Sequence, residues 1–86
     1  MTIKDVCSCP DHTLRIVADD GRIGMFDVSP YLQDEAFADL NDWAAFRQIH
    51  NGTYFIEWAC GADLSADTIE ARWQLLQPFP LTTKLS

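Results

Sequence analysis

The chain has 86 residues, which is long enough for one domain and too short for two. Its composition is 48% apolar and 12% aromatic, which supports a packed core and excludes a disordered chain. Thirteen acidic and six basic side chains give a net charge of −7, which repels nucleic acids and anionic membranes and favours basic partners. We expect one domain over residues 1–86, with an ordered core over 3–78.

The sequence gives no sign of export or of membrane insertion. The first residues contain no apolar stretch of the kind found in secretory signals, and no apolar run approaches the roughly 20 residues of a membrane span. Three cysteines are an odd number, which fits reduced thiols better than disulfides. The sequence therefore predicts a cytoplasmic protein that does not contact the membrane.

The N-terminal third predicts three strands, of which two form a hairpin. β-Branched residues indicate a short strand over 3–7, and alternating apolar residues indicate strands over 13–19 and 22–28. Asp20–Gly21 is expected to join the last two, because a tight type I′ turn needs the positive φ that glycine adopts freely. Gly24 weakens local pairing and suggests a bulge.

Short helical turns and a second hairpin are expected next. Over residues 34–46 large apolar side chains recur every three positions, which is nearer to helical than to strand spacing. Asn41–Asp42 is expected to divide this segment into two short turns. Residues 46–50 and 53–58 then predict a hairpin with Asn51–Gly52 as its two-residue turn.

The C-terminal part predicts one helix. Residues 60–64 indicate an irregular loop, after which Ser65 caps a helix over 66–77. One face of this helix carries the apolar side chains Ile69, Trp73 and Leu76. After Pro78, residues 79–86 are expected to form a frayed tail. The fold class is therefore α+β, with a small antiparallel sheet made of two hairpins and a first strand, and the helix packed on it.

Three segments carry a resemblance to a known family. They are Leu14-Arg15-Ile16 with the Asp20-Gly21 turn, Phe26-Asp27-Val28-Ser29-Pro30-Tyr31-Leu32, and Ile56-Glu57-Trp58 followed by Gly61-Ala62-Asp63-Leu64-Ser65. In this order and spacing they resemble a small bacterial family, domain-of-unknown-function family 2442, from about residue 3 to residue 73. The resemblance implies an α+β fold and a cytoplasmic protein of bacterial or phage-associated origin, and it implies no catalytic residue.

The same resemblance suggests partners. Some members of that family look fused to a helix-turn-helix domain, and some look paired with another small protein in a toxin–antitoxin-like arrangement. This sequence shows no helix-turn-helix segment after its predicted helix, so we expect no direct contact with nucleic acid.

Cysteine and histidine residues offer two chemical hypotheses. Cys7 and Cys9 with His12 have the residue types of a zinc site, with Cys60 or His50 as the fourth ligand. Paired zinc cysteines usually have two to four residues between them, whereas this pair has one, so free thiols are favoured. A nucleophilic Cys60 activated by His50 is disfavoured because acidic residues flank Cys60. We predict no bound metal and no cofactor.

Acidic and aromatic residues in the family-like segments have structural interpretations as well. Asp27, Glu57 and Asp63 have the chemistry for acid–base catalysis or cation binding, but backbone hydrogen bonding at turns and solvation on a strand are favoured. At least two of the three tryptophans are expected to lie in the core. Trp58 is expected to be partly exposed, because it precedes the loop at Gly61.

We therefore expect a non-catalytic protein-interaction or regulatory module. Its partner would be a small, basic protein that binds the acidic surface or adds a strand to an exposed sheet edge. The same edge would allow a homodimer. The candidate contact residues are Asp19, Asp20, Asp34, Glu35 and Trp58. Two alternatives stay open, which are an accessory transcription regulator acting through a DNA-binding partner and a small metal- or carboxylate-dependent enzyme.

Overall fold

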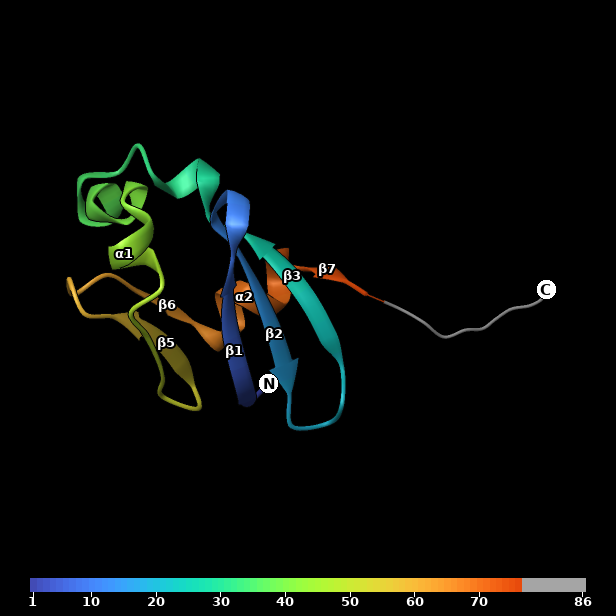
Figure 1. Ribbon diagram of the computed structural model, residues 1–86. Coiled ribbons are helices and arrows are strands. Elements are labelled where there is room, and N and C mark those ends of the chain that lie inside the picture. Colours follow the sequence, from blue (N-terminus) through green and yellow to red (C-terminus); the bar gives the residue numbers. More distant parts are fainter. Residues whose placement is uncertain (77–86) are drawn as a thin grey trace.

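The structure is a computed structural model, and it describes residues 1–76 (Figure 1). The described residues form two antiparallel sheets, with strand orders β1-β2-β3-β7 and β4-β5-β6. The strands are β1 Ile3–Cys9, β2 Thr13–Ala18, β3 Ile23–Asp27, β4 Ile49–Asn51, β5 Phe55–Trp58, β6 Asp63–Ser65 and β7 Gln74–Leu75. The helices are the 3-10 helices η1 Pro10–His12, η2 Ser29–Tyr31 and η3 Glu35–Asn41, and the α-helices α1 Trp43–Phe46 and α2 Ala66–Arg72.

The α+β class is confirmed, but the two hairpins lie in two sheets where one was expected. The sheets meet at the edge of β1, where the Ile3 N–H donates to the Thr53 carbonyl (2.7 Å). The Asn51 amide also donates to the Ile3 carbonyl (3.0 Å). In Figure 1 the second sheet stands beside the first, with α1 above it and α2 behind β1 and β2.

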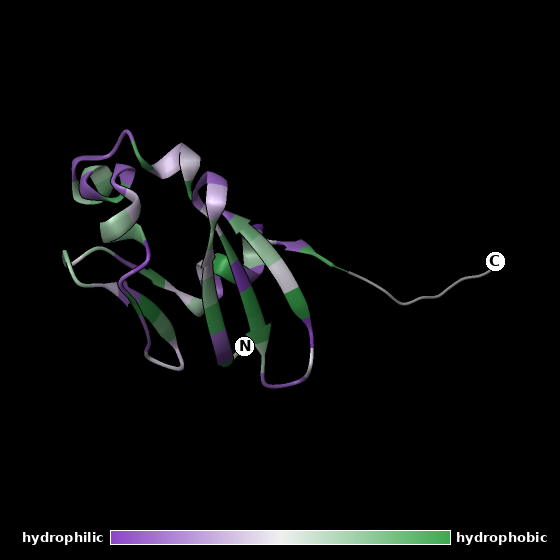
Figure 2. Cartoon of the chain, in the orientation of Figure 1, coloured by the Kyte–Doolittle hydropathy of each residue, from purple (hydrophilic) through white to green (hydrophobic). Residues whose placement is uncertain are grey.

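One hydrophobic cluster draws on both sheets and on the helices (Figure 2). The alternation of each strand places one set of side chains inward, so Leu14 and Ile16 on β2 and Ile56 on β5 are fully buried. The helical segments add Leu40, Phe46 and Ile69. This cluster fixes how the two hairpin turns and α2 come together.

The first hairpin is confirmed, although its turn is longer than expected. The Ala18 N–H donates to the Arg22 carbonyl (2.9 Å), and the Gly21 N–H donates to the Ala18 carbonyl (3.0 Å). Gly21 has a φ of 96°, whereas a type I′ turn needs positive φ at two central residues. The turn is therefore a three-residue loop closed by glycine. The pairing of β2 with β3 runs unbroken past Gly24, so the suggested bulge is wrong.

The second hairpin is also confirmed, with its turn shifted along the chain. Asn51 pairs with Ile56 inside the ladder, and Thr53, with a φ of 75°, lies at the tip. The Asn51 side chain is engaged twice, because its Oδ1 also accepts from the Thr53 N–H (2.8 Å). Asn51 therefore holds the junction between the sheets and is not a turn residue.

The segment between the hairpins divides as expected. η3 ends at Asn41, and Asp42 caps α1 by accepting from the Ala44 N–H (3.3 Å). Trp43, at the start of α1, is 45% exposed.

The expectation that Trp58 is partly exposed is wrong, because this residue is only 1% exposed. Its indole N–H donates to the Phe46 carbonyl (2.9 Å), and its ring stacks on the Phe46 ring at 5.9 Å. Phe37 on η3 meets the same indole edge-on at 6.2 Å. Residues from the segment between the hairpins therefore cover this tryptophan, which is a core residue and not part of the surface.

The C-terminal helix begins as predicted and ends early. Ser65 caps α2 by accepting from the Thr68 N–H (3.1 Å), but the helix stops at Arg72. Trp73 is extended, with a φ of −76° and a ψ of 161°, and β7 pairs with β3.

Two further expectations about this part are corrected. The predicted loop at 60–64 contains the start of β6, and Leu76 is 46% exposed instead of buried in a helical stripe. Gln77, Pro78 and the tail expected at 79–86 lie outside the described residues.

Candidate functional site

A hollow of about 500 Å³ lies at the turn end of the first hairpin, and we call it the acidic hollow. The β2–β3 turn, the β4–β5 turn and the first turn of α2 meet there. Its lining residues are Met1, Thr2, Ala18, Asp19, Asp20, Tyr54 and Asp67. Three carboxylates from two distant parts of the chain thus share one depression with a tyrosine ring that is 69% exposed.

Local hydrogen bonds hold the hairpin carboxylates in place. The Thr2 hydroxyl donates to Asp19. Asp20 accepts from the backbone N–H of Arg22 (3.0 Å) and from its Nε (2.8 Å). The backbone hydrogen bond, followed by the guanidinium, lowers the pKa of Asp20 below its ordinary value. Asp20 is therefore ionised at neutral pH.

Arg22 ties the hairpin to α2. Its Nη2 lies 2.8 Å from Glu70 Oε2, and its guanidinium lies 5.6 Å from the centre of the Trp73 ring. The other Glu70 oxygen accepts from the Met1 amino group at 3.2 Å. The hydrogen bond that Arg22 donates to Glu70 is the largest cause of the raised pKa of Arg22. Arg22 therefore pairs with two carboxylates, Asp20 and Glu70. In contrast, Asp19 and Asp67 form no ion pair with any described residue.

Replacing Glu70 by glutamine is expected to destabilise the protein near pH 7 and to have little effect in acid. The pKa of Glu70 is lowered from its ordinary value of 4.5, chiefly by the hydrogen bond from Arg22. The ionised carboxylate therefore stabilises the fold above pH 4.5, and this stabilisation is lost as the pH falls through the lowered pKa. Because these groups are half-exposed, salt should weaken the effect.

Urea denaturation of the wild type and Glu70→Gln, near pH 7 and at about pH 3, measures this dependence. A loss of stability of the same size at both pH values would show that the carboxylate charge is not responsible.

A second hollow, of about 540 Å³, lies at the opposite end of β3 and α2, and we call it the mixed-charge hollow. Its lining residues are Phe26, Asp27, Pro30, Tyr31, Asp34 and Arg72. Asp27 ends β3, and its Oδ1 accepts from the Ser29 N–H (2.9 Å), as expected for a residue at this turn. Four of the six lining residues come from one segment that carried the family resemblance.

The five residues predicted to contact a partner do not form one surface. Asp19 and Asp20 lie in the acidic hollow, and Asp34 lies in the mixed-charge hollow. Glu35 is exposed on η3, outside the lining of both, and Trp58 is buried.

Sequence reasoning missed Tyr54 and Asp67 in the acidic hollow and Arg72 in the mixed-charge hollow. Tyr54 follows Thr53, the positive-φ residue at the tip of the second hairpin, and its side chain is exposed. Asp67 lies in the first turn of α2, where the macrodipole favours a carboxylate whether or not a ligand binds there. No local signal links these residues, because folding alone brings them together.

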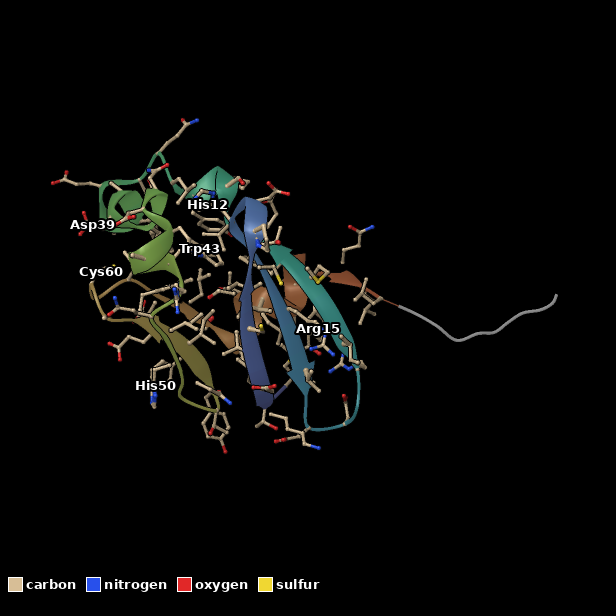
Figure 3. The ribbon with its side chains drawn as sticks, in the orientation of Figure 1. His12, Arg15, Asp39, Trp43, His50 and Cys60 are labelled. Atoms are coloured by element: carbon tan, nitrogen blue, oxygen red, sulfur yellow. The ribbon has the colours of Figure 1, made fainter. Side chains whose placement is uncertain are left out.

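The cysteines and histidines do not all come together in the described structure. Figure 3 shows His12 near the top of β1, Cys60 beside the second sheet and His50 lower on the same sheet. Cys7 and Cys60 are exposed free thiols, and Cys9 is half-buried. Among residues 1–76, no three His, Cys, Asp or Glu side chains are grouped in a way that would hold a metal ion.

Of the three acids of the family-like segments, two lie side by side and the third lies elsewhere. Glu57 and Asp63 are cross-strand partners on β5 and β6, and both are exposed. Asp27 lies at the end of β3 in the other sheet. The described structure therefore pairs Glu57 with Asp63 outside the lining of both hollows and places Asp27 apart from them.

Comparison with known proteins identifies a family. The family described as Protein of unknown function (DUF2442) matches residues 3–74, in agreement with the resemblance noted above. Neither a curated protein nor a solved structure matches the chain. Over residues 1–76, no helix has the length and apolar character needed to cross a bilayer. Because the match covers most of the 86 residues, the chain belongs to this family of unknown function.

Proposed function

We propose that this domain is a non-catalytic protein-interaction module that binds a basic segment of a partner protein at the acidic hollow. The observation that carries the proposal is the shared hollow itself. Asp19 and Asp20 from the hairpin face the same depression as Asp67 from α2, beside the exposed ring of Tyr54. Three carboxylates and an aromatic face suit lysine or arginine side chains.

The charge balance around the hollow supports this proposal. The two nearby cations are already paired with carboxylates: Asp20 and Glu70 share the guanidinium of Arg22, and Glu70 also binds the Met1 amino group. Asp19 and Asp67 have no basic partner among the described residues. The net charge of −7 adds a long-range attraction that speeds the encounter with a basic protein.

Docking through side chains is better supported than strand addition. Each sheet has two edge strands. β1 and β4 meet each other at the junction between the sheets, where Ile3 bonds to Asn51 and Thr53, and the remaining edge strands are β6, with three residues, and β7, with two. An added strand would find few backbone groups to pair with on either of them. A homodimer formed through an edge strand would meet the same restriction.

A titration of the ¹⁵N-labelled protein with a lysine- and arginine-rich hexapeptide at low salt tests the proposal. We expect saturable shifts that are largest at Asp19, Asp20, Tyr54 and Asp67, because these residues line the hollow. The double variant Asp19→Asn, Asp67→Asn should bind the peptide at least about fivefold more weakly, since it loses two ionic contacts of roughly 0.5 kcal/mol each. Added salt should weaken binding to the wild type.

The matched control is the double variant Asp39→Asn, Glu57→Gln, which removes the same charge from exposed positions outside the hollow. It should bind the peptide almost as tightly as the wild type. If both double variants weaken binding equally, or if the shifts spread over all acidic residues, the peptide responds to net charge alone and the proposal is wrong.

A further inference from the structure

The charged side chains that line the mixed-charge hollow form no ion pair with one another. Arg72 lines it together with Asp27 and Asp34, yet Arg72 forms no ion pair with any described residue. The contrast within the same protein is Arg22, which binds two carboxylates at 2.8 Å each. A guanidinium and two carboxylates that face one hollow without pairing are available to a ligand that carries both charges.

The carboxylates also have free hydrogen-bonding capacity. Asp27 uses Oδ1 to accept from the Ser29 N–H, and its other oxygen has no partner among the described residues. Asp34 precedes η3 without capping it through its side chain. Both side chains are exposed, so each can accept hydrogen bonds from an ammonium group.

The floor between the charges is aromatic and fixed by the core. Phe26 is 1% exposed, and its ring lies 5.7 Å from that of Tyr31. Tyr31 in turn lies 5.5 Å from Phe37, which packs against the core. Pro30 adds a rigid apolar wall. The volume of about 540 Å³ lies within the range of roughly 300–1,000 Å³ that is typical of small-molecule sites.

We propose that the mixed-charge hollow binds a free α-amino acid with a large apolar side chain. Arg72 pairs with the carboxylate of the ligand, because a guanidinium binds a carboxylate through two parallel hydrogen bonds. Asp27 and Asp34 bind its ammonium group, and its side chain packs on Pro30 and Tyr31, which the buried Phe26 supports from below. This site lies at the other end of β3 and α2 from the acidic hollow, so it stands independently of the proposed function.

Calorimetry and NMR titration with L-phenylalanine test the site. We expect saturable binding with shifts at Phe26, Asp27 and Tyr31. N-acetyl-L-phenylalanine lacks the ammonium group and L-phenylalanine amide lacks the carboxylate, and each should bind about tenfold more weakly, as expected for the loss of one charged hydrogen-bonding group. L-Leucine and L-methionine extend the series to other apolar side chains.

A pair of arginine variants separates a carboxylate contact from a general charge effect. Arg72→Gln should weaken binding of L-phenylalanine about tenfold and leave the affinity for the amide unchanged, because the amide has no carboxylate to lose. Arg15→Gln, at an exposed position of β2 outside the hollow, should change neither affinity (Figure 3).

Three results would overturn the assignment. The first is the absence of saturable binding for all three amino acids up to about 10 mM, which lies beyond the range of a specific site. The second is an equal effect of Arg72→Gln on the amino acid and its amide. The third is an effect of Arg15→Gln as large as that of Arg72→Gln. Far-UV circular dichroism of both variants confirms that they remain folded.

Discussion

Replacing Gly24 by alanine is expected to lower the free energy of unfolding by about 2–3 kcal/mol, the upper part of the range for an overpacked core. A Cβ atom on Gly24 would overlap the ring of Trp73. The backbone cannot move away easily, because Gly24 pairs with Ile16 on one side and with Leu75 on the other. Urea denaturation followed by far-UV circular dichroism measures the change without depending on tryptophan fluorescence.

The double variant Gly24→Ala, Trp73→Leu provides the control. If the clash with the indole causes the loss, the smaller leucine relieves it, and the double variant is less destabilised than the sum of the two single variants. Additive effects would show that Gly24 matters for another reason, such as backbone geometry within β3.

The contact between Gly24 and Trp73 also explains why the helix is shorter than its sequence pattern indicates. Ile69, Trp73 and Leu76 have helical spacing, and nothing nearby in the sequence opposes a longer helix. The missing side chain at Gly24 leaves room for an indole, and the free edge of β3 pairs with Gln74 and Leu75. A tertiary contact about fifty residues away in the sequence therefore overrides the local preference.

The hairpins could be predicted because alternation and turn residues are local properties. The exact turn geometry could not, since Asn51 bonds to the Ile3 carbonyl, 48 residues away, and the tip moves to Thr53. The division into two sheets depends on the same contact. A pattern of short strands does not encode which strand edges will meet.

Only the part of the acidic hollow that consists of residues adjacent in the chain could be predicted from the sequence. Asp19 and Asp20 stand out as adjacent acids in a turn, but Asp67 and Tyr54 join them only when α2 and the β4–β5 turn pack near the N-terminal strand. The sequence predicts partial exposure of Trp58. Its exposure was misjudged because the residues that cover it, Phe37 and Phe46, come from a different segment.

Replacing Trp58 by phenylalanine is expected to cost about 2 kcal/mol, and replacing it by alanine about 3–5 kcal/mol. Trp58 is among the largest fully buried side chains and contacts the rings of both Phe37 and Phe46. A small domain has a total stability of only about 5 kcal/mol, so the alanine variant should retain about 0–2 kcal/mol and be partly unfolded at 25 °C. Urea denaturation of Trp58→Phe and circular dichroism of Trp58→Ala measure these effects.

Trp43→Phe is the matched control, because the Trp43 ring is 45% exposed and lies 6.0 Å from the same Phe46 ring. This exposed substitution should change stability by no more than about 0.5 kcal/mol. An equal loss in Trp43→Phe and Trp58→Phe would mean that burial of the Trp58 indole does not account for its contribution.

The Phe46 carbonyl allows the hydrogen bond of Trp58 to be separated from its packing. This oxygen accepts from the Trp58 indole at 2.9 Å and from the Ser8 hydroxyl at 3.0 Å. In Trp58→Phe the Ser8 hydroxyl still satisfies the carbonyl, so the loss reflects mainly the smaller ring. In Ser8→Ala, Trp58→Phe neither side chain remains to donate to this oxygen, and a buried acceptor without a donor costs about 1–3 kcal/mol. The double variant should therefore lose more stability than the sum of the two single variants, whereas additive losses would show that the carbonyl finds another donor.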